Sequence, residues 1–519
     1  MGPTVFVLPG NNPSGHLYLA PDSTTSTQNQ GDTAIAQEPW QHSAPLCFLS
    51  YRYGTWPFGL FKKLGIPGPK PLPFFGTCLE YRKGFLEFDT ECFQKYGKIW
   101  GIYDGRQPAL VVMDPQIIKT VLVKECYSTF TNRRHIDLAG ELRNAVSLAE
   151  DDQWKRLRTV LSPTFTSGKL KEMFPTMKHF GEMLVKNVQK RVEKDSSVPV
   201  KDFFGSYSMD VVTSTSFGVN IDSMNNPKSP FVREMQKLTK FDFANPVFVL
   251  AFVCPFLIPL MAKMNISFFD SNKTKTNLPQ PHPLLLVPLW NHQHHFSTLH
   301  ILSPPALSDI EVLSQAFIFI FAGYEPTSNT LSYLAYLLAL HPDVQQKVVD
   351  EIDTVLPNKA PLTYEAIMQL DYLDMAVSET LRLYPLGGRI ERVCKRDVEI
   401  NGVTIPKGTI VIIPPYTLHR NTEYWPNPEE FRPERFSKEN KDSIDPYTYL
   451  PFGAGPRNCI GMRFALLTLK VAIAAILQNF TFQVCKETQI PLKLLSQGLL
   501  TPEKPIVLKL VPRTNTANA

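Results

Sequence analysis

The ten residues from Phe452 to Gly461, FGAGPRNCIG, place a single cysteine, Cys459, in a glycine-rich turn. They fit the pattern F-x-x-G-x-R-x-C-x-G at all five fixed positions. If each residue type occurs about 5% of the time, five fixed positions match by chance in on the order of one in several thousand chains of this length. The stretch is therefore a strong signal for one kind of site, and the rest of the chain is interpreted from it.

Each fixed position has a physical reason if the cysteine binds a metal. The apolar run Phe464–Leu477 predicts a buried helix, so Cys459 lies just ahead of a helix N-terminus, where the thiolate form is favoured. Glycines such as Gly461 let a large flat ligand approach the backbone closely. Arg457 supplies a cation for an anionic group on that ligand, and Phe452 shields the sulfur from water.

The motif resembles the haem-binding loop of the cytochromes P-450, in which the cysteine is the proximal iron ligand. This resemblance implies that Cys459 is the metal ligand and that Phe452, Arg457 and Gly461 bind the cofactor. Two simpler interpretations stay open from the motif alone. The cysteine is a buried free thiol beside a glycine turn, or the loop cradles a phosphate. The second is poorer, because GAGPRN lacks a third glycine in register and a Gly-Lys-Ser/Thr ending.

Composition describes a globular enzyme rather than a nucleic-acid-binding or disulfide-linked protein. The 519 residues are 43% hydrophobic and 19% charged, and the net charge of +5 gives no case for nucleic acid. The eight cysteines are scattered without C-x-x-C pairs, which argues against a disulfide framework or a zinc site and favours a reducing compartment. No stretch of 18 apolar residues predicts a transmembrane helix.

Two segments depart from an ordinary domain, and we expect the domain itself to span residues 55–519. Residues 1–54 are predicted to be a disordered tail without a membrane anchor, since the first fifty contain no Lys or Arg and are rich in polar residues and proline. The apolar run Val247–Ala262 contains Pro255 and Pro259, so it either packs in the core or lies in a membrane interface.

Residues 265–307 are the atypical segment within the domain. They hold six prolines, five of the eleven histidines and one acidic residue, without helical or strand periodicity. The cluster His292, His294 and His295 is weak evidence for a metal, because no carboxylate partner accompanies it. Our preferred interpretation is a splice form or gene model that departs from the usual protein, which keeps open a non-catalytic product.

The sequence Ser308-Asp-Ile-Glu311 is a capping box that predicts the start of a helix running to about Leu340. Within it, AGYEPT resembles the family pattern [A/G]-G-x-[D/E]-T, in which an acid and an alcohol steer protons. The resemblance implies catalytic roles for Glu325 and Thr327, with Pro326 standing where the alcohol is usual. Proline frees the carbonyl four residues back, so we expect a kink there. Loss of the alcohol also leaves open a haem-thiolate isomerase.

Glu379 and Arg382 are three residues apart and share one face of a predicted helix. Such a pair is usually a surface salt bridge. Because PERF, with Arg435, lies about twenty residues ahead of Cys459, the three resemble the family's buried Glu-Arg-Arg triad, which is structural rather than catalytic.

Long runs from Tyr51 to Asn265 and from Ala306 onward resemble the mammalian cytochromes P-450 of family 3, subfamily A, among them LFKKLGIPGP, TSTSFGVNIDS and HPDVQQK. The resemblance implies a mainly α fold with a small β-rich subdomain. It also implies haem b and a monooxygenase of steroids, drugs and other xenobiotics, with electrons from NADPH through the P-450 reductase and cytochrome b5 as a further candidate partner. The implied location is the cytoplasmic face of the endoplasmic reticulum membrane.

The same resemblance assigns further site residues by position. Propionate binding falls to Arg133, Trp154, Arg158, Arg392 and Arg457. The substrate pocket draws on Ser147, Leu148, Phe241, Phe243, Phe321, Ala322, Pro326, Leu386, Gly387 and Arg389. Lys155 and Arg156, which lie between Trp154 and Arg158, are expected to face outward and to steer an acidic electron donor.

Overall fold

Helices make up most of the computed structural model, which describes residues 43–194, 197–226, 247, 250, 257–264, 266, 307–495 and 499–513. Its α-helices are α1 (Ser43–Thr55), α2 (Leu60–Lys63), α3 (Phe85–Tyr96), α4 (Pro115–Lys119), α5 (Asp151–Leu161), α6 (Ser167–Val192), α7 (Val200–Phe217), α10 (Ile258–Lys263), α13 (Asp309–Leu340), α14 (Pro342–Val355), α15 (Tyr364–Met368), α16 (Asp371–Leu383), α17 (Pro415–Leu418), α18 (Lys438–Lys441) and α19 (Met462–Leu477). Among the helices in these ranges, none combines the length and apolar character needed to cross a membrane.

The remaining elements are short. The 3-10 and π turns are η1 (Trp56–Gly59), η2 (Cys78–Lys83), η3 (Thr120–Lys124), η4 (Asp137–Asn144), η5 (Ser162–Phe165), η8 (Pro357–Lys359) and η9 (Pro433–Phe436). The strands are β1 (Ile99–Asp104), β2 (Gln107–Val112), β3 (Ser197–Pro199), β4 (Ile390–Val393), β5 (Val398–Ile400), β6 (Val403–Ile405), β7 (Ile410–Ile413), β8 (Phe480–Gln483), β9 (Leu494–Leu495), β10 (Thr501–Pro502) and β11 (Val507–Pro512). The expected mainly helical fold with a small β-rich part is confirmed.

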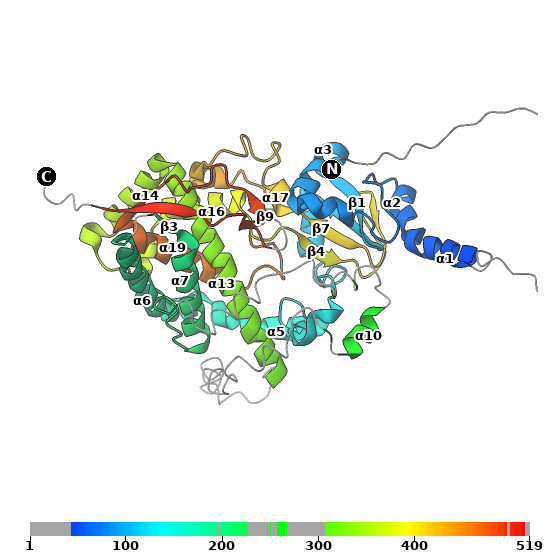
Figure 1. Cartoon of the computed structure of the whole chain (residues 1–519), viewed down its shortest axis with the longest axis horizontal. Helices are drawn as coiled ribbons and strands as arrows, with labels where there is room; N and C mark the ends of the chain where they lie inside the picture. The colour runs from blue at the N-terminus through cyan, green and yellow to red at the C-terminus, as the bar shows by residue number, and fades with distance from the viewer. Residues whose placement is uncertain are drawn as a thin grey trace, which may run out of the picture. The chain divides into compact units, whose positions relative to one another are not determined.

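The largest sheet has the strand order β1-β2-β7-β4, with β2 and β7 parallel and the other pairs antiparallel. All four residues of β7 are buried, as expected for an apolar strand between two neighbours. Figure 1 shows this sheet at one end of the view and helices α6, α7, α14 and α19 at the other, with α13 between them. Strand β4, at the sheet edge, carries Arg392.

Helix α13 begins at the residue that the sequence predicts. Ser308 Oγ accepts a hydrogen bond from the Glu311 backbone N–H at 3.4 Å, and the Glu311 carboxylate accepts one from the Ser308 backbone N–H at 3.0 Å. This reciprocal pair satisfies two N–H groups that a helix start leaves free. The helix then continues to Leu340 and includes Pro326 in its interior. The predicted helix is therefore confirmed at both ends.

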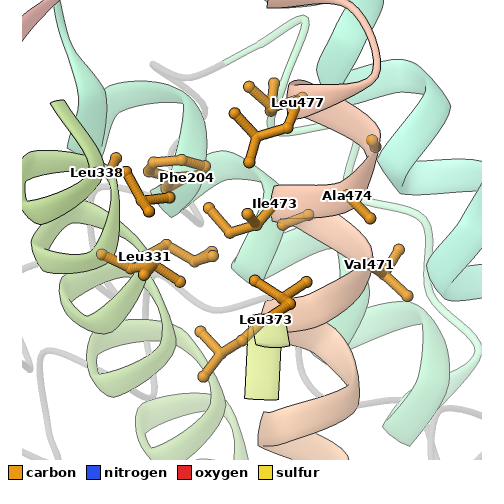
Figure 2. Packing of buried hydrophobic residues seen from close by; sticks show 14 of the residues in the cluster. Phe204, Leu331, Leu338, Leu373, Val471, Ile473, Ala474 and Leu477 are labelled. Carbon is orange, nitrogen blue, oxygen red and sulfur yellow. The ribbon is translucent and has the colours of Figure 1, made fainter. Parts of the chain in front are cut away.

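The main hydrophobic core holds α13 against α7, α16 and α19. Figure 2 shows Leu331 of α13 and Ile473 of α19 pointing toward one another, with Phe204 of α7 nearby. All three side chains are fully buried, and burying each contributes roughly 1.5 to 3 kcal/mol. Most residues of α19 are apolar and buried, as expected for a helix in such an interior. The core thus fixes α13 relative to the loop that precedes α19.

The N-terminal region differs from the expected tail in one respect. Ser43–Thr55 form helix α1, although residues 1–54 were expected to be irregular; residues 1–42 lie outside the described part. The chain divides into two compact units, one ending at Ser50 and the other beginning at Tyr51. Of the apolar run Val247–Ala262 the structure describes little besides the start of α10. Phe241, Phe243, the His292, His294 and His295 cluster and nearly all of 265–307 fall outside the described residues.

Candidate active site

A cavity of about 580 Å³ lies within the unit that begins at Tyr51. Its volume is within the roughly 300 to 1,000 Å³ typical of small-molecule sites. The predicted site residues that line it are Arg133, Ser147, Leu148, Trp154, Arg158, Ala322, Pro326, Thr327, Leu386, Gly387, Arg389, Arg392, Phe452, Arg457, Cys459 and Gly461. Segments far apart in the sequence therefore converge on one chamber.

The turn that carries Cys459 is closed by backbone hydrogen bonds. The Cys459 N–H donates to the Phe452 carbonyl at 2.9 Å, and the Asn458 N–H donates to the Gly455 carbonyl at 3.1 Å. Gly455 has a φ of 72°, and a Cβ on it would lie 1.9 Å from the Leu122 carbonyl oxygen. Only glycine fits this position. The turn presents the Cys459 side chain toward the cavity, where it is accessible to solvent.

The thiol of Cys459 sits among opposing electrostatic effects. Although the sulfur is open to the cavity, the protein atoms packed around it desolvate it and raise its pKa above the usual value, while the N–H of Gly461 and the charges of Arg158 and Arg133 lower it. A metal ion adds a far stronger stabilisation of the thiolate. The site therefore suits a sulfur that ionises when it coordinates a metal.

Arg133, Arg392 and Arg457 form a group of guanidinium ions on one side of the cavity. Burial, followed by the charges of the other two arginines, lowers the pKa of Arg392 to about 9. Burial, followed by the charge of Arg133, lowers the pKa of Arg457 to about 10. Among the described residues, Arg392 Nε and both Arg457 Nε and Nη1 have no hydrogen-bond partner. Buried cations with orphaned N–H groups fit an anionic ligand.

Trp154 and Arg158, four residues apart on α5, both reach the cavity, as their spacing predicts. The Arg457 guanidinium lies 4.6 Å above the centre of the Trp154 ring. Arg158 makes a contact that the sequence does not reveal. Its Nη1 and Nη2 donate to the backbone and side-chain oxygens of Asn458 at 2.9 and 2.8 Å. Asn458, the residue before Cys459, is thus held by a side chain of α5.

Helix α13 forms one wall of the cavity with a single face. Its lining residues are Ile318, Phe319, Ala322, Gly323, Pro326, Thr327 and Thr330. Since successive residues of a helix are about 100° apart, residues 321 and 325 point away from this face. Phe321, expected in the pocket, is accordingly not among the lining residues, and Phe319 takes that place.

Glu325, expected to act in catalysis, is also placed off the cavity. Its carboxylate pairs with Lys201 of α7 and accepts a hydrogen bond from Asn329 Nδ2 at 3.3 Å. Pro326 and Thr327 do face the cavity. The acid and the hydroxyl predicted to cooperate therefore lie on different faces of α13.

Paired charges that the sequence did not indicate hold another part of the wall. Arg389 is bound by Asp89 of α3 through two hydrogen bonds of 2.9 and 2.7 Å. Arg134 bridges Glu391, at 2.9 and 3.0 Å, and Asp104, at 2.5 Å. These partners are up to 300 positions apart in the chain, so no local pattern announces them. Arg389 and Arg134 each have a carboxylate partner, whereas Arg392 and Arg457 have none among the residues that the structure describes.

The three residues of the expected triad lie in contact and are buried. Arg382 Nε and Nη2 donate to the Glu379 carboxylate at 2.7 and 2.8 Å, and Arg435 Nε donates to it at 3.2 Å. Arg382 Nη1 also donates to the His419 carbonyl at 2.9 Å. The network lies outside the cavity lining, between α16 and η9.

The expected docking pair on α5 is divided. Lys155 is partly exposed and pairs with Asp152 at 2.9 Å. Arg156 instead turns toward the start of α13, where it pairs with the buried carboxylate of Glu311. Only one of the two basic side chains is therefore directed to solvent.

Known proteins that are similar to this chain are named as cytochromes P450. The sequence model of the family Cytochrome P450 matches residues 66–510. Cytochrome P450 3A9 of Rattus norvegicus is 57% identical over 499 residues, covering 93% of this chain and 98% of the relative. Cytochrome P450 3A12 of Canis lupus familiaris is 57% identical over 496 residues, with 93% and 99% covered. Cytochrome P450 3A5 of Homo sapiens is 56% identical over 495 residues, with 93% and 98% covered.

Proposed function

This chain belongs to the cytochrome P450 family, and we propose that it oxidises bulky lipophilic molecules, steroids and drugs among them, in the cavity beside Cys459. It is a haem-thiolate monooxygenase that receives electrons originating from NADPH through a redox partner. The observation that carries the proposal is the convergence of one thiol, a group of arginines with orphaned N–H groups and an apolar wall on a single cavity.

Haem b fits the residues present. Cys459 would coordinate the iron, and the orphaned N–H groups of Arg392 and Arg457 would donate to the propionates together with Arg133. When bound, haem supplies the activation and cleavage of dioxygen, favoured by electron donation from the thiolate. With haem in place, Phe452, which lines the cavity beside the closed turn, would shield the sulfur from water.

The substrate would be held mainly by burial of its apolar surface. Leu148, Ala322 and Leu386 line the cavity with aliphatic groups, and Ser147 adds a hydroxyl. Burial contributes about 25 cal/mol for each Å² of apolar surface and has no preferred direction. Gly387 lines the wall without a side chain, and a Cβ there would meet nothing within 4 Å. Such a wall suits bulky molecules of varied shape.

Among the hydroxyl-bearing residues that line the cavity, we assign proton delivery to Thr327, which directly follows Pro326. Pro326 has no N–H, so the Ala322 carbonyl, which lies on the same face, cannot receive its usual helical hydrogen bond from residue 326. A water molecule between this carbonyl and the Thr327 hydroxyl would be well placed to pass protons into the cavity. Glu325 and Lys201 would then supply protons from the flank of α13.

We assign the electron supply to the NADPH-dependent P450 reductase, with cytochrome b5 as a second donor, and the location to the cytoplasmic face of the endoplasmic reticulum membrane. Lys155 is the basic residue of α5 left to meet an acidic donor. Leu260, within α10, and Met264, just after its end, are 55% and 63% exposed and support contact with lipid.

The test is a spectrum followed by an activity assay. The reduced carbon-monoxide complex of the whole chain should show a strongly red-shifted Soret band, and Cys459→Ser should lose it. Steroid hydroxylation should then require NADPH and reductase. Rearrangement of a peroxide without NADPH would support an isomerase instead, and a purified chain without haem absorbance would contradict the proposal.

A further inference from the structure

His419 occupies a buried position between the Glu379, Arg382 and Arg435 triad and the segment that leads into the Cys459 turn. It directly follows α17, and its side chain is fully buried. The sequence pattern did not single it out, and it does not line the cavity. Its hydrogen bonds nevertheless join the two motifs that define the site.

The hydrogen bonds of the His419 ring determine which nitrogen carries the proton. Nε2 lies 2.8 Å from the backbone nitrogen of Leu450, and Nδ1 lies 3.2 Å from the backbone oxygen of Arg382. A backbone N–H only donates and a carbonyl only accepts. Nε2 must therefore be the acceptor, and Nδ1 must carry the hydrogen and donate it to Arg382.

The surroundings keep this ring neutral. Burial is the main cause that lowers the pKa of His419 to about 3, and the charges of Arg382 and Arg420 act in the same direction. The lone pair on Nε2 is thus available to the Leu450 N–H at physiological pH. In return, the His419 backbone carbonyl accepts from Arg382 Nη1 at 2.9 Å, so triad and histidine are bonded in both directions.

Leu450 connects this bond to the turn. Its carbonyl accepts the Gly453 N–H at 3.1 Å, and Phe452, two residues on, accepts the Cys459 N–H at 2.9 Å. The start of the turn therefore has one fixed point on a buried side chain, and that side chain is fixed by the triad.

We propose that His419 is a positioning residue that ties the Cys459 turn to the triad through the Leu450 N–H and so keeps the sulfur oriented for thiolate coordination. This inference rests on the proposed role of Cys459. It gives the buried triad a task in the chemistry of the iron, in addition to its part in the core.

Three substitutions of His419 test the hydrogen bonds of its two ring nitrogens separately. His419→Phe keeps a buried ring and removes both hydrogen bonds. His419→Gln places an amide oxygen at the reach of Nε2, whereas His419→Asn places its amide group near the position of Nδ1. We expect the red-shifted fraction of the reduced carbon-monoxide complex to fall roughly threefold to tenfold in the Phe variant, as for one buried hydrogen bond. Gln should recover most of it, and Asn should not.

The matched control is Tyr449→Phe. Tyr449 is the neighbour of Leu450, and its ring packs at a tilt against His419 with 5.4 Å between the ring centres. Its hydroxyl donates a partly buried hydrogen bond to the Ser378 carbonyl at 2.8 Å. The control should lower the thermal midpoint about as much as the His419 variants while leaving the Soret position unchanged. A spectral loss that is equal in the Gln and Asn variants, or that also occurs in the control, overturns the inference.

The spectrum of the wild-type chain distinguishes a failure of the proposed role of Cys459 from a failure of the positioning role of His419. If it lacks the red-shifted band, the proposed role of Cys459 fails and the inference fails with it. If the wild type shows the band and His419→Phe keeps it at full strength, only the positioning role of His419 is overturned.

Discussion

Two buried groups of arginines in this chain differ in how their charges are met. Arg382 and Arg435 share the carboxylate of Glu379, and their other N–H groups find backbone carbonyls such as those of His419 and Asn427. Arg392 and Arg457 are equally buried, but in the described part of the chain they keep N–H groups without a hydrogen-bond partner. The arginines of the first group find their partners within the chain and stabilise the fold. Those of the second group need an anionic ligand to satisfy their N–H groups. Buried arginines without partners therefore distinguish a ligand site from a structural network.

The largest effect should follow from removing the carboxylate of Glu379, which Arg382 and Arg435 share. Glu379→Gln keeps the shape of the side chain but leaves the buried Arg382 without its carboxylate partner, and it leaves Arg435 with only the half-exposed Glu430 at 3.7 Å. Removing one partner of a buried ion pair costs about 3 to 5 kcal/mol. Urea unfolding measures the loss. The exposed pair Lys83 and Glu91 supplies the control, since Glu91→Gln should change stability little. Equal effects at the two carboxylates would remove the distinction between buried and surface pairs.

A substitution of Arg392, in the second group, should affect the stability of the haem-free chain and the retention of haem by the loaded enzyme in opposite directions. Arg392→Met removes a buried charge, so the haem-free chain should be unchanged or slightly more stable. The loaded enzyme should release haem roughly tenfold to a hundredfold faster, because a charge-assisted hydrogen bond to a propionate is lost. Haem transfer to an acceptor protein gives the rate. Destabilisation of the haem-free chain would place Arg392 with the structural arginines.

The pH dependence of this same variant gives a smaller and more specific effect. Burial, with Arg133 and Arg457, lowers the pKa of Arg392 from 12.5 to about 9. Between these values the unfolded chain binds a proton that the folded chain has released, so this residue makes stability rise with pH there. The advantage of Arg392→Met in the haem-free chain should therefore shrink as pH rises from about 8 to about 10. A constant difference across that window would mean that the Arg392 guanidinium stays charged there and that burial does not lower its pKa to about 9.

The smallest effect on stability should come from adding an uncharged side chain to the cavity wall. Gly387 faces the cavity, and a Cβ there meets nothing within 4 Å, so Gly387→Val should alter stability by no more than about 0.5 kcal/mol. The added side chain narrows the open region. Hydroxylation of bulky steroids should slow several-fold while small substrates react as before, which a comparison of kcat/KM across substrates measures. Loss of haem in this variant would contradict a purely steric effect.

The sequence predicts what is local and misses what is assembled by the fold. The turn at Cys459, the capping box at Ser308 and the pair Glu379 and Arg382 each lie within ten residues, so spacing reveals them. The bridge from Arg134 to Asp104 and Glu391 joins three distant segments, and no short pattern encodes it.

The placement of Phe321 and Glu325 shows a different limit. A helix of 3.6 residues per turn fixes which side chains share a face, but not which face meets the cavity. The resemblance implies a place in the pocket for Phe321 and a part in proton delivery for Glu325, but neither residue shares the cavity face of the helix with Ala322 and Pro326. The structure supplies the missing orientation, because α13 packs its other side against α7, where Lys201 reaches Glu325.

The start of α13 has a consequence for how this chain can change over evolution. Ser308 and Glu311 cap the helix between themselves, Arg156 of α5 binds Glu311, and the Gln315 side chain accepts the Val146 N–H at 2.7 Å. Every one of these contacts comes from residue 308 onward or from the first third of the chain. A recombination junction just upstream of Ser308 can therefore exchange one coding segment for another while the same α13 side chains continue to face the cavity.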